Sequence, residues 1–150
     1  MTCQSIISPA PTVLDPSDTV AKAATALLAQ SYATLPVVDG QGRFVGIFGA
    51  RELIGLLLPR AVRLGNDLGD LGFVSDGITD LSARLAAQSG ETVGKHMAPH
   101  QTVRPETSLV EALLLLYRGD AFLPVIEDSG KLVGIVTAVD ALARISGASE

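Results

Sequence analysis

The polar side chains best placed to do chemistry are a threonine and an aspartate three positions apart, Thr137 and Asp140, in the run Gly134-Ile-Val-Thr-Ala-Val-Asp. At a helix start, such a pair can form a cap, in which the hydroxyl accepts a hydrogen bond from the amide three residues later. The same pair can hold a ligand, because a carboxylate accepts two hydrogen bonds together and a helix N-terminus attracts an anion. The spacing alone leaves both interpretations open.

The remaining reactive side chains do not form a catalytic or metal-binding pattern. Cys3 lies at the terminus, and two histidines alone supply no triad. His96 and His100 have the spacing of zinc ligands on one helix face, but Pro99 interrupts that helix, and no Cys, Asp or third His is near in sequence. Glycine-rich phosphate-binding motifs are also missing. We therefore expect neither a metal site nor a catalytic residue, and no enzyme activity.

Composition excludes several classes of partner. Hydrophobic residues make up 47% of the 150 residues, enough for a buried core, and the net charge is -5 with no basic run. Binding to nucleic acid or to an anionic membrane surface is therefore not expected. A single cysteine cannot form an intramolecular disulfide. The sequence shows no signal peptide, and its apolar runs are far shorter than the ~20 residues of a membrane span, so we expect a cytoplasmic protein.

The chain contains two copies of one unit. The segments that begin at Leu35 and Leu123 align without a gap and share Leu-Pro-Val, a turn glycine, Val-Gly-Ile and a final alanine. Upstream, we align Thr12-Val13 with Thr102-Val103, eight residues before Val20 and Val110, and Ile7-Ser-Pro with Met97-Ala-Pro. On this alignment the second copy is two residues shorter between its first helix and its Leu-Pro.

Each copy predicts the same order of elements: an extended piece, a helix, a hairpin of two strands and a closing helix. Asp18 is the expected N-cap of the first helix, and Ser108 with Glu111 has capping-box spacing in the second copy. Pro36 and Pro124 lack a backbone donor and are expected at strand starts. The expected helices are 19–30 and 109–118, the strands are 35–38, 44–48, 123–126 and 132–137, and the closing helices begin near 50 and 138.

The segment between the copies is too apolar for a solvated linker. Its pattern predicts a helix that ends near residue 58, a short helix or turn at 61–64, a loop, and a helix over 78–88. We expect this segment to pack outside the repeats or in a dimer interface.

This pattern of helix, Leu-Pro-Val, acidic turn and Val-Gly-Ile-Val-Thr-x-x-Asp resembles the CBS repeat, and two copies resemble a CBS pair, or Bateman module. The resemblance implies an α+β fold of two βαββα repeats, packed sheet to sheet about a pseudo-twofold axis. We assign residues 1–58 and 93–150 to the repeats and 59–92 to a helical linker. The family further implies a homodimer and clefts for adenosyl ligands such as AMP, ADP, ATP or S-adenosylmethionine.

The resemblance also implies roles for residues of the second copy. Asp140 would accept hydrogen bonds from ribose hydroxyls, and Thr137 would contact phosphate. Phe122 is predicted either to stack on the adenine or to fill the core. The adenine slot would be formed by Thr102, Val103, Ala121, Phe122, Leu123 and Pro124.

The first copy departs from the family pattern. Gly49 replaces the hydroxyl residue and Glu52 replaces the aspartate, so this site is expected to be degenerate. Backbone N–H groups of Gly49 and Ala50 are candidate substitutes for the missing donor, and Arg51 is either a solvated helix residue or a phosphate contact. The weaker site would comprise Thr12, Val13, Leu35, Pro36, Gly49 and Glu52.

The sequence therefore predicts a non-catalytic regulatory module that senses an adenine nucleotide, and thus cellular energy status, and signals to a separate, unidentified protein. The alternative is a ligand-free CBS pair that serves dimerisation or protein docking.

Overall fold

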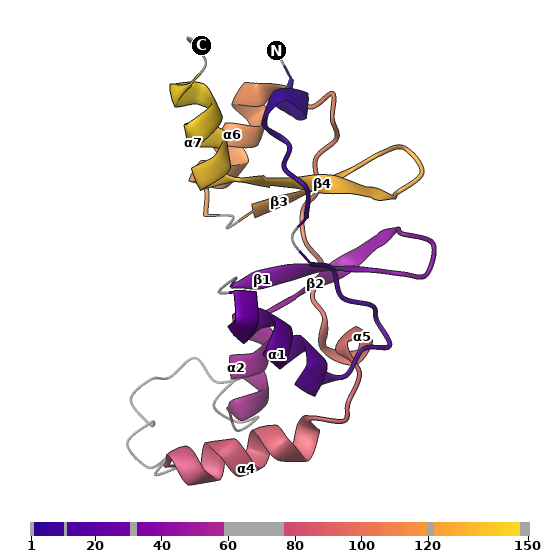
Figure 1. The fold of residues 1–150 in the computed structure, drawn as a ribbon, viewed down its shortest axis with the longest axis vertical. Coiled ribbons are helices and arrows are strands. Elements are labelled where there is room, and N and C mark those ends of the chain that lie inside the picture. The colour runs from indigo at the N-terminus through magenta and orange to yellow at the C-terminus, as the bar shows by residue number, and fades with distance from the viewer. Residues whose placement is uncertain (1, 11, 31–32, 59–76, 120–121, 148–150) are drawn as a thin grey trace.

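The computed structural model describes residues 2–10, 12–30, 33–58, 77–119 and 122–147, and within them the two copies form the same α+β unit (Figure 1). The predicted turn or helix at 61–64 lies outside the described residues. The elements are η1 (Cys3–Ile6), α1 (Val20–Gln30), β1 (Thr34–Val38), β2 (Phe44–Gly49), α2 (Ala50–Leu57), α4 (Ile78–Gln88), α5 (Val93–His96), α6 (Leu109–Tyr117), β3 (Phe122–Ile126), β4 (Leu132–Thr137) and α7 (Ala138–Ser146).

Each copy folds its two strands into an antiparallel hairpin, as predicted. In the first, Thr34 pairs with Gly49, and in the second, Phe122 pairs with Thr137. Both hairpins have a register shift at the same place, after Val37 and after Val125. The repeated sequence therefore specifies a repeated local structure, down to the irregularity.

The prolines of Leu-Pro-Val lie in the middle of their strands, so the prediction of a strand start was wrong. Pro36 and Pro124 are each the third residue of a five-residue strand. Their carbonyls face the edge opposite the hairpin partner, where they accept hydrogen bonds from Leu14 N and Val103 N at 2.9 Å. The missing N–H therefore removes no bond from the hairpin ladder, which is the condition for proline inside a strand.

Helix caps follow the prediction in the second copy but not in the first. Ser108 Oγ accepts from Glu111 N at 3.1 Å, as expected. In the first copy Thr19 caps α1, since its Oγ1 accepts from Lys22 N at 3.1 Å. Asp18 instead accepts from the Asp15 amide at 2.9 Å and pairs with Lys22 Nζ at 3.0 Å. The expected Asp18 cap is therefore wrong by one residue.

Two segments of the chain cross between the copies and join their sheets. Ser8 forms an antiparallel bridge with Ile135 of β4, and Ala98 forms the equivalent bridge with Ile47 of β2. Each bridge has two main-chain hydrogen bonds of 2.8–2.9 Å. The chain then continues to the far edge of the other sheet, where Leu14 runs parallel to β1 and Val103 parallel to β3. Figure 1 shows these crossing segments, described over 8–10, 12–14 and 98–103, between the two halves.

Each hydrophobic core includes side chains from the segment that precedes the other copy. Val93 of α5 belongs to the core of the first copy. Cys3 and Ile6 of η1 belong to the core of the second. Complete burial of such an aliphatic side chain contributes about 1.5–3 kcal/mol. The assignment of residues 1–58 and 93–150 to the two repeats stays a prediction. In space, residues 3–6 pack with the second repeat.

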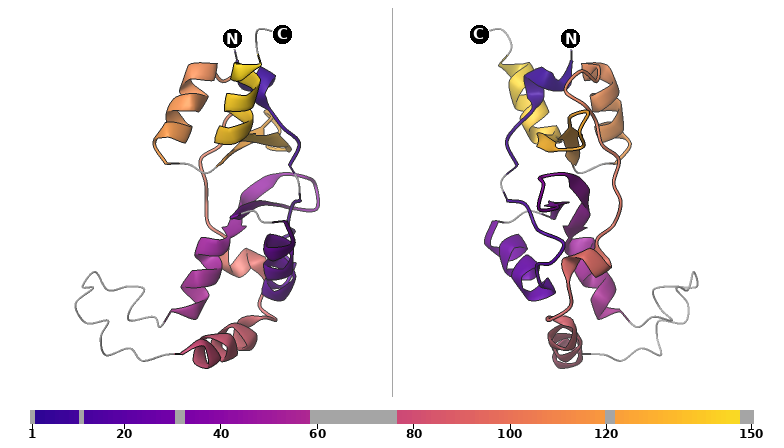
Figure 2. Two further views of the ribbon diagram at one scale, coloured as in Figure 1. Left: turned by 60° about the vertical axis from the view of Figure 1, so that its left-hand side comes forward. Right: turned by 90° about the vertical axis from the view of Figure 1, so that its right-hand side faces the viewer.

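The sheets lie between two layers of helices, with the hairpins stacked face to face (Figures 1 and 2). Alternate strand residues have opposite roles: Leu123 and Val136 pair in the helix-covered core, whereas Pro124 and Ile135 pair on the face toward the other copy. The two hairpin turns are joined by hydrogen bonds of 3.0 Å from Phe44 N to Gly130 O and from Leu132 N to Gly42 O. This pairing of equivalent turns gives the pseudo-twofold arrangement that the resemblance implies.

The bridges also correct the sequence alignment of the copies. Equivalent residues differ in number by 90 at the Ser8 and Ala98 bridges, by 89 at Leu14 and Val103, and by 88 along the first strands. Thr12-Val13 therefore does not align with Thr102-Val103; Val13-Leu14 does. The second copy is therefore one residue shorter than the first in the crossing segment and one residue shorter after its first helix.

Helix α4 covers only the first copy. It spans Ile78–Gln88, as predicted, and packs against α2. Arg84 Nη1 donates to Leu57 O, and Gln88 Nε2 donates to Leu56 O at 2.7 Å. These side chains satisfy two carbonyls at the α2 C-terminus that lack a partner within the helix. None of the described helices is long and apolar enough to cross a membrane.

We predict that Gly134→Ala destabilises the protein through the crossing of the chain. A Cβ at Gly134 comes within 2.5 Å of Ser8 O and 2.7 Å of Ile7 Cγ2, so the crossing segment must shift. We expect the free energy of unfolding, measured with urea, to fall by roughly 1–3 kcal/mol.

The matched control is Gly40→Ala in the exposed hairpin turn, where a Cβ meets nothing within 4 Å. Its expected effect is below about 0.5 kcal/mol. Equal unfolding free energies for the two variants would contradict the packing argument.

Candidate functional site

Thr137 caps helix α7, and its hydroxyl is still able to contact a ligand. Its Oγ1 accepts from Asp140 N at 3.1 Å, so the capping interpretation of the motif is confirmed. Accepting this bond leaves the hydroxyl hydrogen available to a phosphate oxygen. As the ladder partner of Phe122, Thr137 lies at the end of the hairpin next to the α7 N-terminus. Capping and ligand contact are therefore compatible.

Asp140 holds a half-buried carboxylate in the first turn of α7. Its amide bonds to Thr137, but no group in the described part of the chain donates to its side-chain oxygens. A carboxylate in this position can accept two hydroxyl donors from a ligand without losing a bond within the protein.

Glu52, the equivalent residue of the first copy, is engaged within its own helix. Its Oε1 accepts from Gly49 N at 2.9 Å, and its Oε2 lies 3.3 Å from Arg51 Nη1. The Glu52 side chain is 7% exposed, whereas the Arg51 side chain is 89% exposed. A ligand would have to break a helix cap to reach this carboxylate.

The backbone N–H groups proposed as substitutes in the first copy are also occupied, so that expectation was wrong. Gly49 N donates to Glu52, and Ala50 N donates to Ala33 O at 2.7 Å. A Cβ at Gly49 would lie 2.3 Å from Ala33 O and 2.8 Å from Thr34 Oγ1. The close approach of residues 33–34 therefore explains why a hydroxyl residue is missing here.

The predicted walls of the adenine slot are mostly core residues. Leu123 and Val103 belong to the helix-side core, at 0% and 4% exposure, and Pro124 is also buried. Their side chains are therefore not open to a ligand. Thr102 is half-buried, and Ala121 lies outside the described residues.

The walls predicted for the first copy show the same pattern. Leu35 and Pro36 are fully buried. Thr12 is half-buried and Val13 is 43% exposed. Of this set, the structure places Gly49 opposite Thr34 in the ladder, next to Glu52.

Phe122 is buried, and its ring is covered by a residue that sequence reasoning did not assign to the site. The Phe122 side chain is 6% exposed and stacks on the His100 imidazole, with ring centroids 5.6 Å apart and planes inclined by 17°. His100 Nδ1 lies 2.7 Å from Gln101 O, so Nδ1 is the donor of that bond. The signal in the sequence was a planar ring two residues before the predicted wall residue Thr102.

The other histidine, His96, binds a different partner. His96 Nε2 donates to Glu91 Oε1 at 2.8 Å, and Lys95 Nζ lies 2.9 Å from the same oxygen. These two donors lower the pKa of the Glu91 carboxyl below its ordinary value. His96 and His100 therefore do not converge, and no group of three potential metal ligands occurs among the residues that the structure describes.

A groove of about 340 Å³ lies along α2 on the side of the first copy. It is lined by Arg51, Glu52, Ile54, Gly55, Leu56, Leu58, His96 and Ala98. Its carboxylate is the one already held by Gly49 and Arg51. The groove is therefore less suited to a ribose than the surroundings of Asp140.

Comparison with known proteins identifies the repeats. The family described as "CBS domain" matches residues 3–59 and 93–147. The CBS domain-containing protein CBSX2, chloroplastic, of Arabidopsis thaliana is 31% identical over 129 residues, which cover 83% of this chain and 54% of that protein. The chain thus spans about half the length of this curated relative. The cytoplasmic location expected here stays a prediction.

Solved structures of CBS-pair proteins superpose on nearly the whole chain. The crystal structure of Arabidopsis CBSX2 gives a TM-score of 0.77 at 25% identity, with 99% of this chain and 96% of that chain covered. CBSX2 in complex with AMP gives 0.72 at 25% identity, with coverage of 99% and 98%. A CBS domain-containing protein of Kribbella flavida, 21% identical, gives 0.72 over 97% and 99% and supports the fold alone.

Proposed function

Because the chain belongs to the CBS-domain family, we propose that it is a non-catalytic regulatory module that binds one adenosyl ligand beside Asp140 and signals to a separate protein. AMP is the first candidate, and ADP, ATP and S-adenosylmethionine share the same adenosyl group.

The contrast between the two equivalent carboxylates carries this proposal. The Glu52 carboxylate already caps its own helix, whereas the Asp140 carboxylate has no described partner. Two ribose hydroxyls can donate to Asp140, and hydrogen bonds to a charged group are worth about 1.5–3 kcal/mol each. The Thr137 hydroxyl and the positive end of α7 favour a phosphate on the adjoining atoms. The asymmetry supports one ligand per chain rather than two.

The similarity to CBSX2, whose structure has been solved with AMP, supports the choice of ligand. The site adjoins the hairpin face that meets the other repeat, so an occupied site favours one arrangement of the two sheets. A ligand that binds one arrangement better than another shifts the population toward it, and a partner protein can recognise that state.

We predict that AMP at 100 times its Kd stabilises the protein by about 2.7 kcal/mol. The measurement is thermal unfolding with and without AMP, and Asp140→Ala should remove the shift because it deletes the ribose acceptor. ADP, ATP and S-adenosylmethionine are compared in the same assay.

The matched control is Glu52→Gln, which keeps the side-chain oxygen that caps α2 and should retain the full shift. A shift that survives in Asp140→Ala but is lost in Glu52→Gln would move the site to the first repeat. No shift with any adenosyl compound would leave the alternative, a ligand-free docking or dimerisation module.

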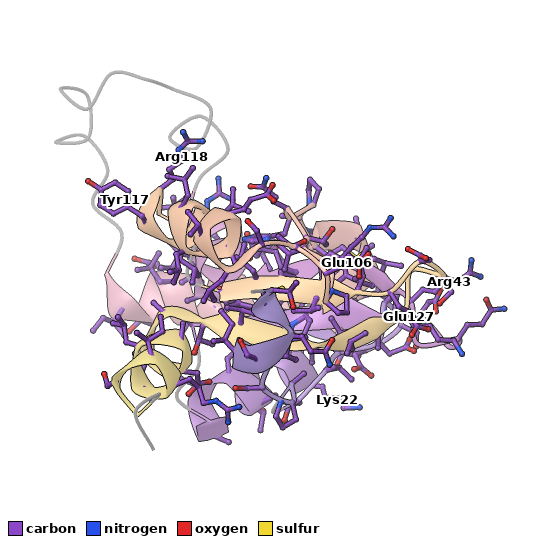
Figure 3. The ribbon with its side chains drawn as sticks, turned by 90° about the horizontal axis from the view of Figure 1, so that it is seen from above. Lys22, Arg43, Glu106, Tyr117, Arg118 and Glu127 are labelled. Atoms are coloured by element: carbon purple, nitrogen blue, oxygen red, sulfur yellow. The ribbon has the colours of Figure 1, made fainter. Side chains whose placement is uncertain are left out.

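Homodimerisation is the second part of the proposal and is supported by an apolar surface on α6 and α7. Six large side chains on these two helices are between 42% and 88% exposed: Val110, Leu114, Tyr117, Val139, Leu142 and Ile145. Figure 3 shows Tyr117 and Arg118 at one end of α6, far from the hairpin tips that carry Arg43 and Glu127. An apolar surface of this extent is typical of an interaction site.

The charges on these helices favour a second copy of the chain. Helix α6 has Glu111 in its first turn and Arg118 as its C-cap, and α7 has Arg144 in its last turn. Where the two-fold axis is perpendicular to α6, the two copies of this helix run antiparallel, which places Glu111 of one copy toward Arg118 of the other.

We predict a dimer in sedimentation velocity and a monomer for Leu142→Glu, because a charge in the apolar interface would be buried without a partner. Ile78→Glu on α4 is the control: Ile78 is 84% exposed but lies on the other half of the molecule, so the dimer should persist. A monomeric wild-type protein at micromolar concentration would contradict this part of the proposal.

A further inference from the structure

We infer that Arg144 of helix α7 holds the base of the ligand by stacking its guanidinium plane on the adenine, an inference that rests on the proposed function. The proposed site has a carboxylate for the ribose and a hydroxyl for the phosphate, but it still needs a surface for the base. The side chains of Val103, Phe122 and Leu123, predicted for that role, are between 0% and 6% exposed. The base therefore needs a contact outside the predicted walls.

Arg144 lies on the same face of α7 as Thr137 and Asp140. The three residues have the spacing i, i+3 and i+7, which places them one above another along a helix. With a rise of about 1.5 Å per residue, Asp140 lies about 4.5 Å beyond Thr137 along the helix axis, and Arg144 about 6 Å beyond Asp140. Hydroxyl, carboxylate and guanidinium therefore follow one another in the order of a phosphate, a ribose and a base.

The two charged side chains of this face are available to a ligand. Residues four apart on a helix are near enough to pair. Within the residues that the structure describes, however, the Arg144 guanidinium has no hydrogen bond or ion pair, and the Asp140 carboxylate has none either. Because Arg144 is also exposed, its side chain can turn toward a ligand on Asp140 without breaking a bond within the protein.

The equivalent face of α2 is built differently. Helices α2 and α7 begin 88 residues apart, at equivalent places in the two hairpins, so the matching residues of the first repeat are Gly49, Glu52 and Leu56. Leu56 is 5% exposed and belongs to the core of the first copy, and Glu52 caps its own helix. The repeats thus differ at all three positions, and only α7 has a hydroxyl, a carboxylate and a planar cation on this face.

The chemistry of a guanidinium suits a purine ring. It is planar and charged, it stacks on aromatic faces, and the cation is attracted by the electron density of the ring. The opposite orientation of the ligand is disfavoured by the helix dipole. The positive end of α7 lies at Thr137, where it attracts the phosphate, whereas Arg144 lies in the last turn.

The test measures ligand affinity of the full chain by calorimetry in wild type, Arg144→Ala, Arg144→Lys and the control Arg43→Ala. Loss of one exposed cation–π contact should weaken AMP binding about two- to fivefold in Arg144→Ala. Arg144→Lys keeps the charge but not the plane, so it should remain weaker than wild type. Arg43 lies at the hairpin tips (Figure 3), and its removal makes the same change in net charge, so affinity should be unchanged.

Further ligands separate a base contact from a phosphate contact. Adenosine has no phosphate, so in Arg144→Ala it should lose the same factor as AMP and ATP. Ribose 5-phosphate has no base, so its affinity should be equal in wild type and Arg144→Ala. Urea unfolding of the ligand-free proteins checks for a structural effect, because a cation in the last turn also stabilises the helix through its dipole.

Unchanged AMP affinity in Arg144→Ala would overturn the inference and leave the proposed function standing. A loss that grows from adenosine to AMP to ATP would also overturn it, because Arg144 would then contact phosphate. An equal loss for AMP and ribose 5-phosphate would do the same, since it indicates a disturbed site. Failure of the wild type to bind any adenosyl compound would reject the proposed function together with this inference.

Discussion

The exchange of crossing segments between the two sheets is the constraint on which the other features depend. Four main-chain hydrogen bonds join Ser8 to Ile135 and Ala98 to Ile47. They require glycine at the adjacent positions 46 and 134, where a Cβ would come within 2.8 Å and 2.5 Å of the crossing backbone. Because of the same crossings, η1 packs in the core of the second copy and α5 in the core of the first. They also place His100 against Phe122. Fold and candidate site therefore share one structural cause.

Within this shared framework, the two repeats have diverged at the strand-to-helix junction. In the second, a threonine caps the helix and leaves the aspartate carboxylate without a described partner. In the first, residues 33–34 approach so closely that only glycine fits, and the glutamate turns back to cap the helix itself. One more methylene in the acidic side chain and a glycine in place of threonine thus let the carboxylate of the first repeat cap its own helix. The asymmetry of the site follows from local packing rather than from a different fold.

Most secondary structure was predictable because it depends on local patterns. The Leu-Pro-Val and Val-Gly-Ile strands occur in both copies, and the Ser108 cap and the helix over 78–88 each follow from a local pattern in a single segment. The sequence predictions were wrong where contacts between segments distant in the chain determine the local structure. Pro36 lies mid-strand because Leu14 needs only its carbonyl, and the true alignment of the crossing segments is visible only in their bridges. The occupied N–H groups of Gly49 and Ala50 and the stack of His100 on Phe122 likewise depend on contacts that no local pattern encodes.

The central claim, that the crossings make one cooperative unit of two repeats, is tested most directly by native-state hydrogen exchange. The amides of Ser8, Ile47, Ala98 and Ile135 each donate across a crossing bridge. The account predicts that all four exchange only through global unfolding, with the same free energy as the core strand amides of both repeats. Fast exchange at Ser8 and Ala98, or two repeats that open with separate free energies, would contradict it.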